Sequence, residues 1–140
     1  GSYLGRIDTR TGKATVLRPP TAGQGARRAW SDSRGRIWIS EWNAGQVGMY
    51  DPRTRRWREW DVPGANPMIY AVYVDQQDKV WLSDFGANAL VRFDPATVTF
   101  SVFFDGAANS VRRACRTAAP GRCGSRPSHR PRFRASGRPR

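Results

Sequence analysis

Two carboxylates, Glu41 and Asp84, are the residues of this sequence best placed to do chemistry, because they occupy matching contexts 43 positions apart. Glu41 ends the run IWISE, Asp84 ends the run VWLSD, and each precedes an aromatic residue in a short loop. Paired carboxylates of this kind could hold a divalent cation or serve as general acid and general base. Each could instead accept backbone N–H groups within its own loop, as short polar side chains often do. We favour this structural interpretation and leave the chemical one open.

The residues around these carboxylates would suit a polar ligand that contains a ring. Exposed aromatic and amide side chains could line a ligand funnel, and a basic side chain beside them could offset an anionic ligand. The candidate ligand-binding residues are Arg27, Glu41, Trp42, Asn43, Tyr70, Asp84, Phe85 and Asn88. We assign no catalytic residue, because residues 1–111 contain no histidine and the single histidine of the chain is His129. A GxSxG element and a Gly-rich phosphate loop are also absent from the sequence.

A repeat of 43 residues explains why the two loops match. Asp8, Asp51 and Asp94 are separated by this step twice. The same step relates identical residues throughout the first 106 positions: Thr11, Thr54 and Thr97; Pro20 and Pro63; Asp32 and Asp75; Trp38 and Trp81; Ser40 and Ser83; Ala44 and Ala87; Pro52 and Pro95. So many coincidences at one offset indicate a duplicated structural unit.

Each unit is predicted to form four short strands. Runs rich in Val, Ile, Trp, Tyr and Phe alternate with turn-forming residues, and no helical periodicity competes with them. Four strands in about 40–45 residues are typical of a β-propeller blade, whose faces must be covered by neighbouring blades. We therefore expect the large aromatic residues to pack between blades.

The predicted fold class is all-β, an incomplete β-propeller of about two and a half four-stranded antiparallel blades. Residues 1–111 form this part, with complete blades at 26–63 and 69–106 and a half blade at 3–17. A closed ring needs roughly 4–8 blades. The remaining blades are thus missing from this chain, which is interpreted as a fragment of a larger ring or the product of a damaged gene. In such a ring the two carboxylate loops and the connectors between blades gather on one face, around the central channel.

The blade pattern resembles that of the streptogramin lyase family, the virginiamycin B lyase-like proteins. Their blades carry the pattern D-x-x-G-x-[IVL]-W-[FIVL]-[ST]-[ED], then a short loop rich in Asn and Gly, then a strand that ends in Asp-Pro. The matching residues are Asp32, Gly35, Ile37, Trp38, Ser40 and Glu41 in the first blade and Asp75, Val80, Trp81, Ser83 and Asp84 in the second, where Asp78 replaces the glycine. The resemblance covers residues 4–106.

This resemblance implies a seven-bladed ring and a lyase that opens a cyclic depsipeptide antibiotic by eliminating its ester bond, with a catalytic histidine and a divalent metal such as Mg²⁺. The chain departs from the family at the decisive point, because no residue of 1–111 matches the histidine or its metal-binding acid partner. We therefore predict a streptogramin lyase-like propeller fragment, a carbon–oxygen lyase by resemblance that is inactive as this chain, with no cofactor evident from the residues. The alternative is a non-enzymatic propeller module that binds a small molecule, a peptide or a protein.

The end of the chain has a different composition from the rest. Residues 1–111 carry 14 Lys and Arg against 11 Asp and Glu, whereas residues 112–140 carry 10 Arg and no acid. Three interpretations stay open for 112–140: a basic arm that binds phosphates, a solvated disordered tail, and an out-of-frame reading of GC-rich DNA. We favour the last, because a frame shifted by two nucleotides can restore the blade string DGRPGEVW with a Trp at position 124, where the repeat requires one. The lack of interleaved aromatic residues argues against nucleic acid as a partner.

Composition also excludes a membrane span, because no stretch approaches ~20 apolar residues. The two cysteines, Cys115 and Cys123, define neither a disulfide framework nor a zinc site. No signal peptide is visible, so cytoplasmic and periplasmic locations both stay open.

Overall fold

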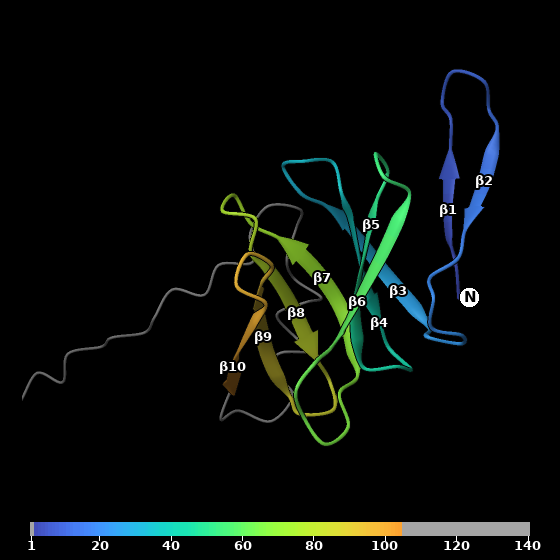
Figure 1. The fold of residues 1–140 in the computed structure, drawn as a ribbon. Helices are drawn as coiled ribbons and strands as arrows, with labels where there is room; N and C mark the ends of the chain where they lie inside the picture. Colours follow the sequence, from blue (N-terminus) through green and yellow to red (C-terminus); the bar gives the residue numbers. More distant parts are fainter. Residues whose placement is uncertain (1, 105–140) are drawn as a thin grey trace, which may run out of the picture.

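Residues 2–104 are described by a computed structural model, and every regular element in this range is a β-strand (Figure 1). The strands are β1 (Leu4–Ile7), β2 (Ala14–Leu17), β3 (Ala26–Ser31), β4 (Ile37–Glu41), β5 (Gln46–Asp51), β6 (Arg56–Asp61), β7 (Ile69–Val74), β8 (Val80–Asp84), β9 (Ala89–Asp94) and β10 (Thr99–Phe104). They form a two-stranded sheet and two four-stranded sheets, all antiparallel. The predicted all-β class with four-stranded antiparallel blades is therefore confirmed for this part. It includes no helix that could cross a membrane.

Each four-stranded sheet is one blade, in which consecutive strands are neighbours. The first blade consists of β3, β4, β5 and β6, and the second of β7, β8, β9 and β10. Trp30 pairs with Trp38 in the first blade, and Tyr73 pairs with Trp81 at the equivalent place in the second. The register between the first and second strands also shifts once in each blade, near the start of β3 and of β7. The 43-residue step of the sequence thus extends to the hydrogen-bonded register of the strands.

An aspartate in front of each second strand fixes both a turn and a tryptophan. Asp32 Oδ1 accepts two backbone N–H groups of its own turn, and Asp32 Oδ2 accepts Trp38 Nε1–H at 2.8 Å. Asp75 does the same in the second blade, where its Oδ2 accepts Trp81 Nε1–H at 2.7 Å. Because an indole N–H removed from water needs a new acceptor, the Asp–Trp spacing of the repeat has a structural cause.

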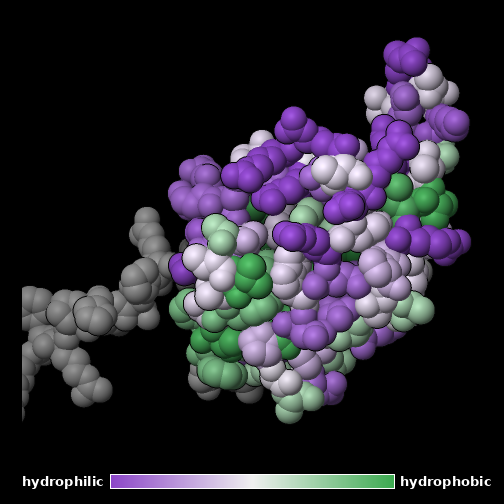
Figure 2. All heavy atoms as spheres, in the orientation of Figure 1, coloured by the Kyte–Doolittle hydropathy of each residue, from purple (hydrophilic) through white to green (hydrophobic). Residues whose placement is uncertain are grey.

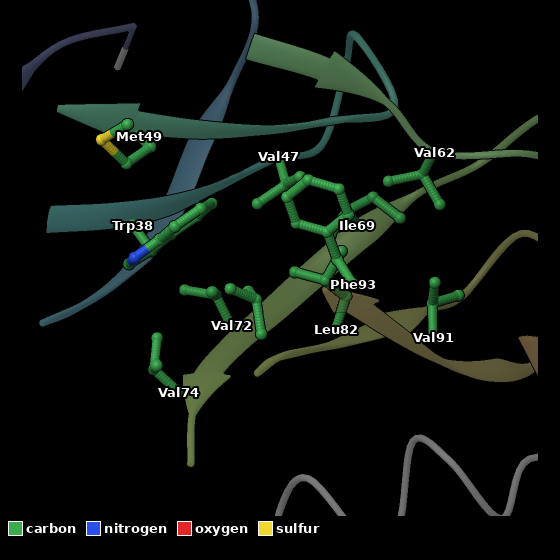
Figure 3. Close-up of a cluster of buried hydrophobic side chains, with 11 residues drawn as sticks. Trp38, Val47, Met49, Val62, Ile69, Val72, Val74, Leu82, Val91 and Phe93 are labelled. Carbon is green, nitrogen blue, oxygen red and sulfur yellow. The ribbon is translucent and has the colours of Figure 1, made fainter. Parts of the chain in front are cut away.

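The main core lies between the two blades, where β7 packs across β3 and β4. Trp38 and Phe93 are fully buried there, and their rings meet edge to face at 6.0 Å. Figure 3 shows how side chains from both blades close this layer; its buried members are Trp38, Val47, Met49, Val62, Ile69, Val72, Val74, Val80, Leu82, Val91 and Phe93. Burial of one large apolar side chain contributes roughly 1.5–3 kcal/mol. The inter-blade layer is therefore the main source of stability in the described part.

A serine hydroxyl also connects the two blades through a hydrogen bond. Ser40 Oγ accepts the backbone N–H of Arg28 at 3.0 Å and donates to the backbone carbonyl of Tyr70, in the next blade, at 2.8 Å. The hydroxyl thus bonds once within its own blade and once across the interface. This accounts for the serine of the repeat in the same way that the indole bond accounts for the tryptophan.

The corresponding face of the second blade is not covered by any described strand. Trp81 stacks on Phe103 with ring centres 5.9 Å apart, as Trp38 stacks on Trp60 at 5.6 Å in the first blade. Trp81 is half-buried, whereas its equivalent Trp38 has no exposed surface. Phe103 is 48% exposed, whereas its equivalent Trp60 is half-buried. Figure 2 shows apolar residues gathered over β9 and β10, at the edge of the molecule where this face opens. Packing between blades is thus observed for Trp38, while for Trp81 it stays a prediction.

The β1–β2 hairpin stands apart from the two blades in Figure 1, and its assignment to a preceding blade stays a prediction. The connector that follows it is fastened to β6 through Thr21. The N–H of Thr21 donates to both carboxylate oxygens of Glu59 at 3.2 Å, and the Thr21 hydroxyl donates to one of them at 2.8 Å. The predicted tail, 112–140, and its boundary at Val111 lie outside the described residues.

Candidate ligand-binding site

The β4–β5 loop and the β8–β9 loop lie at the same end of the two blades, beside the starts of β3 and β7 (Figure 1). Backbone hydrogen bonds fasten each loop to the chain that enters its blade. Trp42 N–H donates to the carbonyl of Gly25 at 3.1 Å, and Phe85 N–H donates to the carbonyl of Met68 at 2.9 Å. This end, which we call the loop face, is where the candidate residues were expected to gather.

Three aromatic side chains from the two blades meet on the loop face. Trp42 lies 5.6 Å from Phe85 and 6.0 Å from Tyr70 in edge-to-face contacts, and Tyr70 stacks on Phe85 at 5.1 Å. Aromatic pairs at such separations contribute about 0.5–1.5 kcal/mol each beyond the burial of their area. All three rings are half-buried. We call Trp42, Tyr70 and Phe85 the ring cluster; all three were candidates from the sequence.

Two arginines of β3 lie over rings of this cluster. The guanidinium carbon of Arg27 is 5.3 Å from the centre of the Trp42 ring, and that of Arg28 is 4.9 Å from the centre of the Tyr70 ring. Arg28 Nη2 also donates to the Tyr70 hydroxyl at 2.7 Å. Cation–π contacts of this kind are worth about 0.5–1 kcal/mol at exposed sites. They hold both guanidinium groups in place on the aromatic surface.

Glu41 precedes Trp42 in the chain and is a buried acid. It has no exposed surface, and neither carboxyl oxygen has a hydrogen-bond partner among the described residues. Burial, together with the negative charge of the neighbouring Glu59, raises the pKa of Glu41 to about 8. The contact with Glu59 does not have hydrogen-bond geometry, so we treat Glu59 as a neighbouring charge. The side chain leans over Gly48, where any Cβ would lie 2.7 Å from Glu41 Oε1.

Asp84 has a different role from Glu41, although the two positions are equivalent. It is also buried, but its Oδ1 accepts the N–H groups of Met68 and Gly86 at 2.8 Å each and that of Ala87 at 3.3 Å. The carboxylate therefore closes its own loop and fastens it to the connector. Asp84 follows the structural interpretation proposed from the sequence, and Glu41 does not.

The two asparagines lie in the loops themselves. Asn43 is exposed, and its Nδ2 donates to the carbonyl of Gly23 in the connector at 3.0 Å. Asn88 ends the β8–β9 loop in the left-handed backbone region, with a φ of 51°. Asparagine tolerates this conformation better than most residues. Both asparagines thus have a structural task at the positions where the sequence suggested ligand contacts.

Sequence reasoning missed two buried or charged residues of the first blade and its connector, Glu59 and Gln24. Glu59, which acts on the pKa of Glu41, is replaced by Val102 one repeat later, and Gln24 is replaced by Pro67. Gln24 is nevertheless buried, and neither atom of its side-chain amide has a partner in the described part. The candidates were chosen from the loops and strand starts at one end of the blades, so Glu59, within β6, could not be found in this way.

The described residues do not fit the divalent metal that the resemblance implies. No group of three or more His, Cys, Asp or Glu within 2–104 is arranged to hold a metal ion. Asp84 directs its Oδ1 to three N–H groups, and burial holds Glu41 in its neutral form near pH 7. A neutral acid is a poor ligand for a hard cation. We therefore derive no chemical step through a metal at this site.

The opposite end of the blades is polar and carries two shallow hollows. One is lined by Arg34, Arg36, Gln77, Asp78, Lys79, Asp94, Pro95 and Ala96, and the other by Arg34, Arg36, Asp51, Arg53 and Thr54. Charged partners already engage two of the basic groups, because Arg36 pairs with Asp32 and Lys79 pairs with Asp94, each at 2.6 Å. Neither hollow contains an aromatic residue, so the loop face remains the better candidate site.

Comparison with known proteins gives matches to solved structures. No protein-family model and no curated protein matches the chain. The described fold is similar to virginiamycin B lyase from Staphylococcus aureus, with a TM-score of 0.69 and 17% identity over 76% of this chain. A streptogramin B lyase structure matches with a TM-score of 0.71 and 24% identity over 77% of this chain. The fold is that of the streptogramin lyases.

The streptogramin lyase fold is shared over only part of those proteins. The chain spans about a third of their length, 35% of either lyase chain. A catalytically inactive histidine-to-alanine variant of the Staphylococcus aureus lyase, determined with quinupristin, matches with a TM-score of 0.71 at 18% identity, over 78% of this chain and 36% of the variant. The extracellular domain of a putative hybrid two-component system from B. thetaiotaomicron also matches, with a TM-score of 0.60 at 18% identity, over 72% of this chain and 13% of that one. The resemblance found in the blade sequence is thus confirmed for the fold.

Proposed function

We propose that the chain is part of a streptogramin lyase-like propeller and that its loop face binds a ligand that contains a ring. The observation that carries this proposal is the ring cluster, in which Trp42 of one blade meets Tyr70 and Phe85 of the next. Half-buried aromatic surface with polar groups at its edge is the usual composition of a small-molecule site. A ligand bound here would contact both blades at once.

We further propose that this stretch binds without opening the ligand, as a non-enzymatic module. Elimination of an ester requires a base that removes a proton, and near neutral pH that base is most often histidine. Residues 2–104 contain none. Glu41 is the acid with a suitable pKa, but its side chain is fully buried in the described part and is not accessible to a ligand on the loop face. Lyase activity of a longer protein would depend on residues outside this range.

Quinupristin is a direct probe of both ligand binding and the lack of cleavage, because the structure of an inactive lyase variant of this fold was determined with it. Titration of the 140-residue chain is expected to change tryptophan fluorescence saturably, and chromatography of the mixture should recover quinupristin intact. Trp42→Ala should weaken this binding at least ten-fold. Trp30→Ala is the matched control, because Trp30 lies on β3 in contact with Tyr73, away from the loop face.

Two results would contradict the proposal. Absence of saturable binding, or equal loss of binding in Trp42→Ala and Trp30→Ala, would remove the ring cluster as a ligand site. Time-dependent conversion of quinupristin to its linear product by the purified chain would show that this stretch is catalytic.

A further inference from the structure

The arrangement of Arg27 on Trp42 points to the charge of the ligand. We propose that Arg27 binds an oxyanion, a carboxylate or a phosphate, carried next to a ring by the ligand of the loop face. This inference rests on the proposed function, since it adds a charge requirement to the same site. It concerns Arg27 rather than Arg28, and the contacts of the two side chains give the reason.

Arg28 is already engaged by the protein. Its Nη2 donates to the Tyr70 hydroxyl at 2.7 Å and its Nη1 donates to the backbone carbonyl of Arg27 at 3.2 Å. Its guanidinium also lies over the Tyr70 ring. These contacts connect β3 of one blade to β7 of the next. Arg28 is therefore a structural residue that supports the ring cluster.

Arg27 is held by the Trp42 ring alone. Its side chain has no hydrogen bond or ion pair with another described residue, and it is exposed. The two candidate carboxylates do not pair with it, because Asp84 bonds to backbone N–H groups and Glu41 is buried and neutral near pH 7. The loop face therefore has a guanidinium that forms no ion pair with an acid among residues 2–104.

A guanidinium that lies on an aromatic ring keeps its N–H groups available at its edge. Arginine is planar, always charged, and binds carboxylate or phosphate through two parallel hydrogen bonds. The Trp42 contact orients the group before the ligand arrives, so less side-chain entropy is lost on binding. The ring cluster lies directly beside it, which places an apolar ring of the ligand next to the anion.

Three naphthalene probes separate the ring from the charge: 2-naphthylmethanol, 2-naphthoate and 2-naphthyl phosphate. All three should bind the 140-residue chain at the loop face, and the two anions should bind about ten-fold more tightly than the alcohol. The ratio of naphthoate to naphthyl phosphate affinity indicates which oxyanion the site prefers. Affinities are measured by calorimetry at low salt, where the charge is least screened.

Variants of Arg27 test the assignment. Arg27→Gln should remove the preference, so that the anions and the alcohol bind with similar affinity, whereas Arg27→Lys should retain only part of the preference because it keeps the charge without the planar group. Arg34→Gln is the matched control: it removes the same charge from an exposed residue in the β3–β4 turn, at the opposite end of the blade, and should change nothing.

The outcomes separate this inference from the proposed function. Equal binding of all three probes by the unaltered chain would overturn the inference and leave the ring site standing. A preference for anions that survives in Arg27→Gln would also overturn it. If no naphthalene probe binds, the inference fails, whereas the proposed function is decided by the binding of quinupristin.

Discussion

Glu41 and Asp84 occupy equivalent positions in adjacent blades, yet only Asp84 bonds to the backbone of its own loop. In the first blade, the loop N–H groups of Asn43 and Ala44 donate instead to the backbone carbonyl of Gln24, at 3.0 and 3.3 Å. The longer Glu41 side chain is then left to lean over Gly48 without a partner. One repeat position therefore performs two physical tasks, a loop closure and a buried acid.

The buried acid predicts a pH dependence of stability. Because the pKa of Glu41 is raised from about 4.5 to about 8, the folded chain holds a proton that the unfolded chain releases between these values. The contribution is fully present below pH 4.5 and is lost as the pH rises through 8, so stability should fall across this window. Glu41→Gln should remove the fall and make the chain more stable than the unaltered one at pH 8.5. Urea unfolding at pH 5 and at pH 8.5 measures the difference.

Asp78→Asn is the control for this titration. The pKa of Asp78 is lowered by its hydrogen bonds from Ser33, so this group stays ionised throughout the window from pH 5 to pH 8.5. The fall in stability should be the same in Asp78→Asn as in the unaltered chain. A stability that does not change between the two pH values in the unaltered chain would contradict the raised pKa of Glu41.

Asp84 should matter for stability rather than for ligand binding. Its removal in Asp84→Ala leaves three N–H groups of the loop and connector without their acceptor, and buried groups left in this way cost about 2–3 kcal/mol in the free energy of unfolding. Asp51→Ala, which removes one exposed bond from Arg53 N–H, should cost less than about 1 kcal/mol. Chemical unfolding compares the two variants. Equal costs would mean that the Asp84 bonds do not hold the loop.

The two tryptophans of the repeat should differ in the same measurement. Trp38 is fully buried between blades, so Trp38→Ala should cost about 3–5 kcal/mol through the cavity that it leaves. Trp81 is half-buried on the outer face of the second blade, and Trp81→Ala should cost roughly 1–2 kcal/mol. Both variants also lose the bond to an aspartate, so the difference between them reports burial. A larger cost at Trp81 would mean that this face is covered.

Sequence reasoning reached the parts of this protein that follow the repeat. Spacing predicted the strands and the burial of Trp38, because each depends on a period that two blades share. It could not predict that Arg28 bonds to Tyr70, because that contact depends on how one blade is placed against the next.

The buried acid shows the same limit more clearly. The identity of positions 41 and 84 as carboxylates suggested a pair with one task, whereas the environment of Glu41 includes Glu59, which has no counterpart in the second blade. The electrostatics of Glu41 follow from burial and from a neighbouring charge, and neither is encoded in the spacing of the repeat.

Strain in a turn gives a further prediction. Gly12, Arg55 and Val98 are equivalent positions, and all three lie in the left-handed backbone region, at φ values of 72°, 56° and 55°. A β-branched residue is poorly suited to this region, where an L-residue loses roughly 1–2 kcal/mol. Val98 is also 55% exposed, so its side chain gains little from packing. Val98→Gly should therefore raise the free energy of unfolding by about 1 kcal/mol, whereas Ala96→Gly in the same turn should lower it.

The uncovered face of the second blade should accept another blade in the register of the repeat. Ser40 donates across the blade interface to the carbonyl of Tyr70, while Ser83, its equivalent, accepts the N–H of Ala71 but has no acceptor for its own hydrogen among residues 2–104. Trp81 and Phe103 offer the aromatic surface that Phe93 covers on Trp38 and Trp60 in the first blade. We therefore expect this face to bind a further blade in the way that the first blade binds the second.

Inserting a second copy of residues 69–111 directly after Val111 places a new blade at the required spacing of 43 residues. The extended chain should unfold at a higher urea concentration, because Trp81 and Phe103 become covered. Ser83→Ala supplies the sharper test. In the present chain it removes one bond within the blade, and in the extended chain it should cost about 1 kcal/mol more, because the new carbonyl also loses its donor. Equal costs of Ser83→Ala in the two chains would mean that the added blade does not dock as the second blade docks on the first.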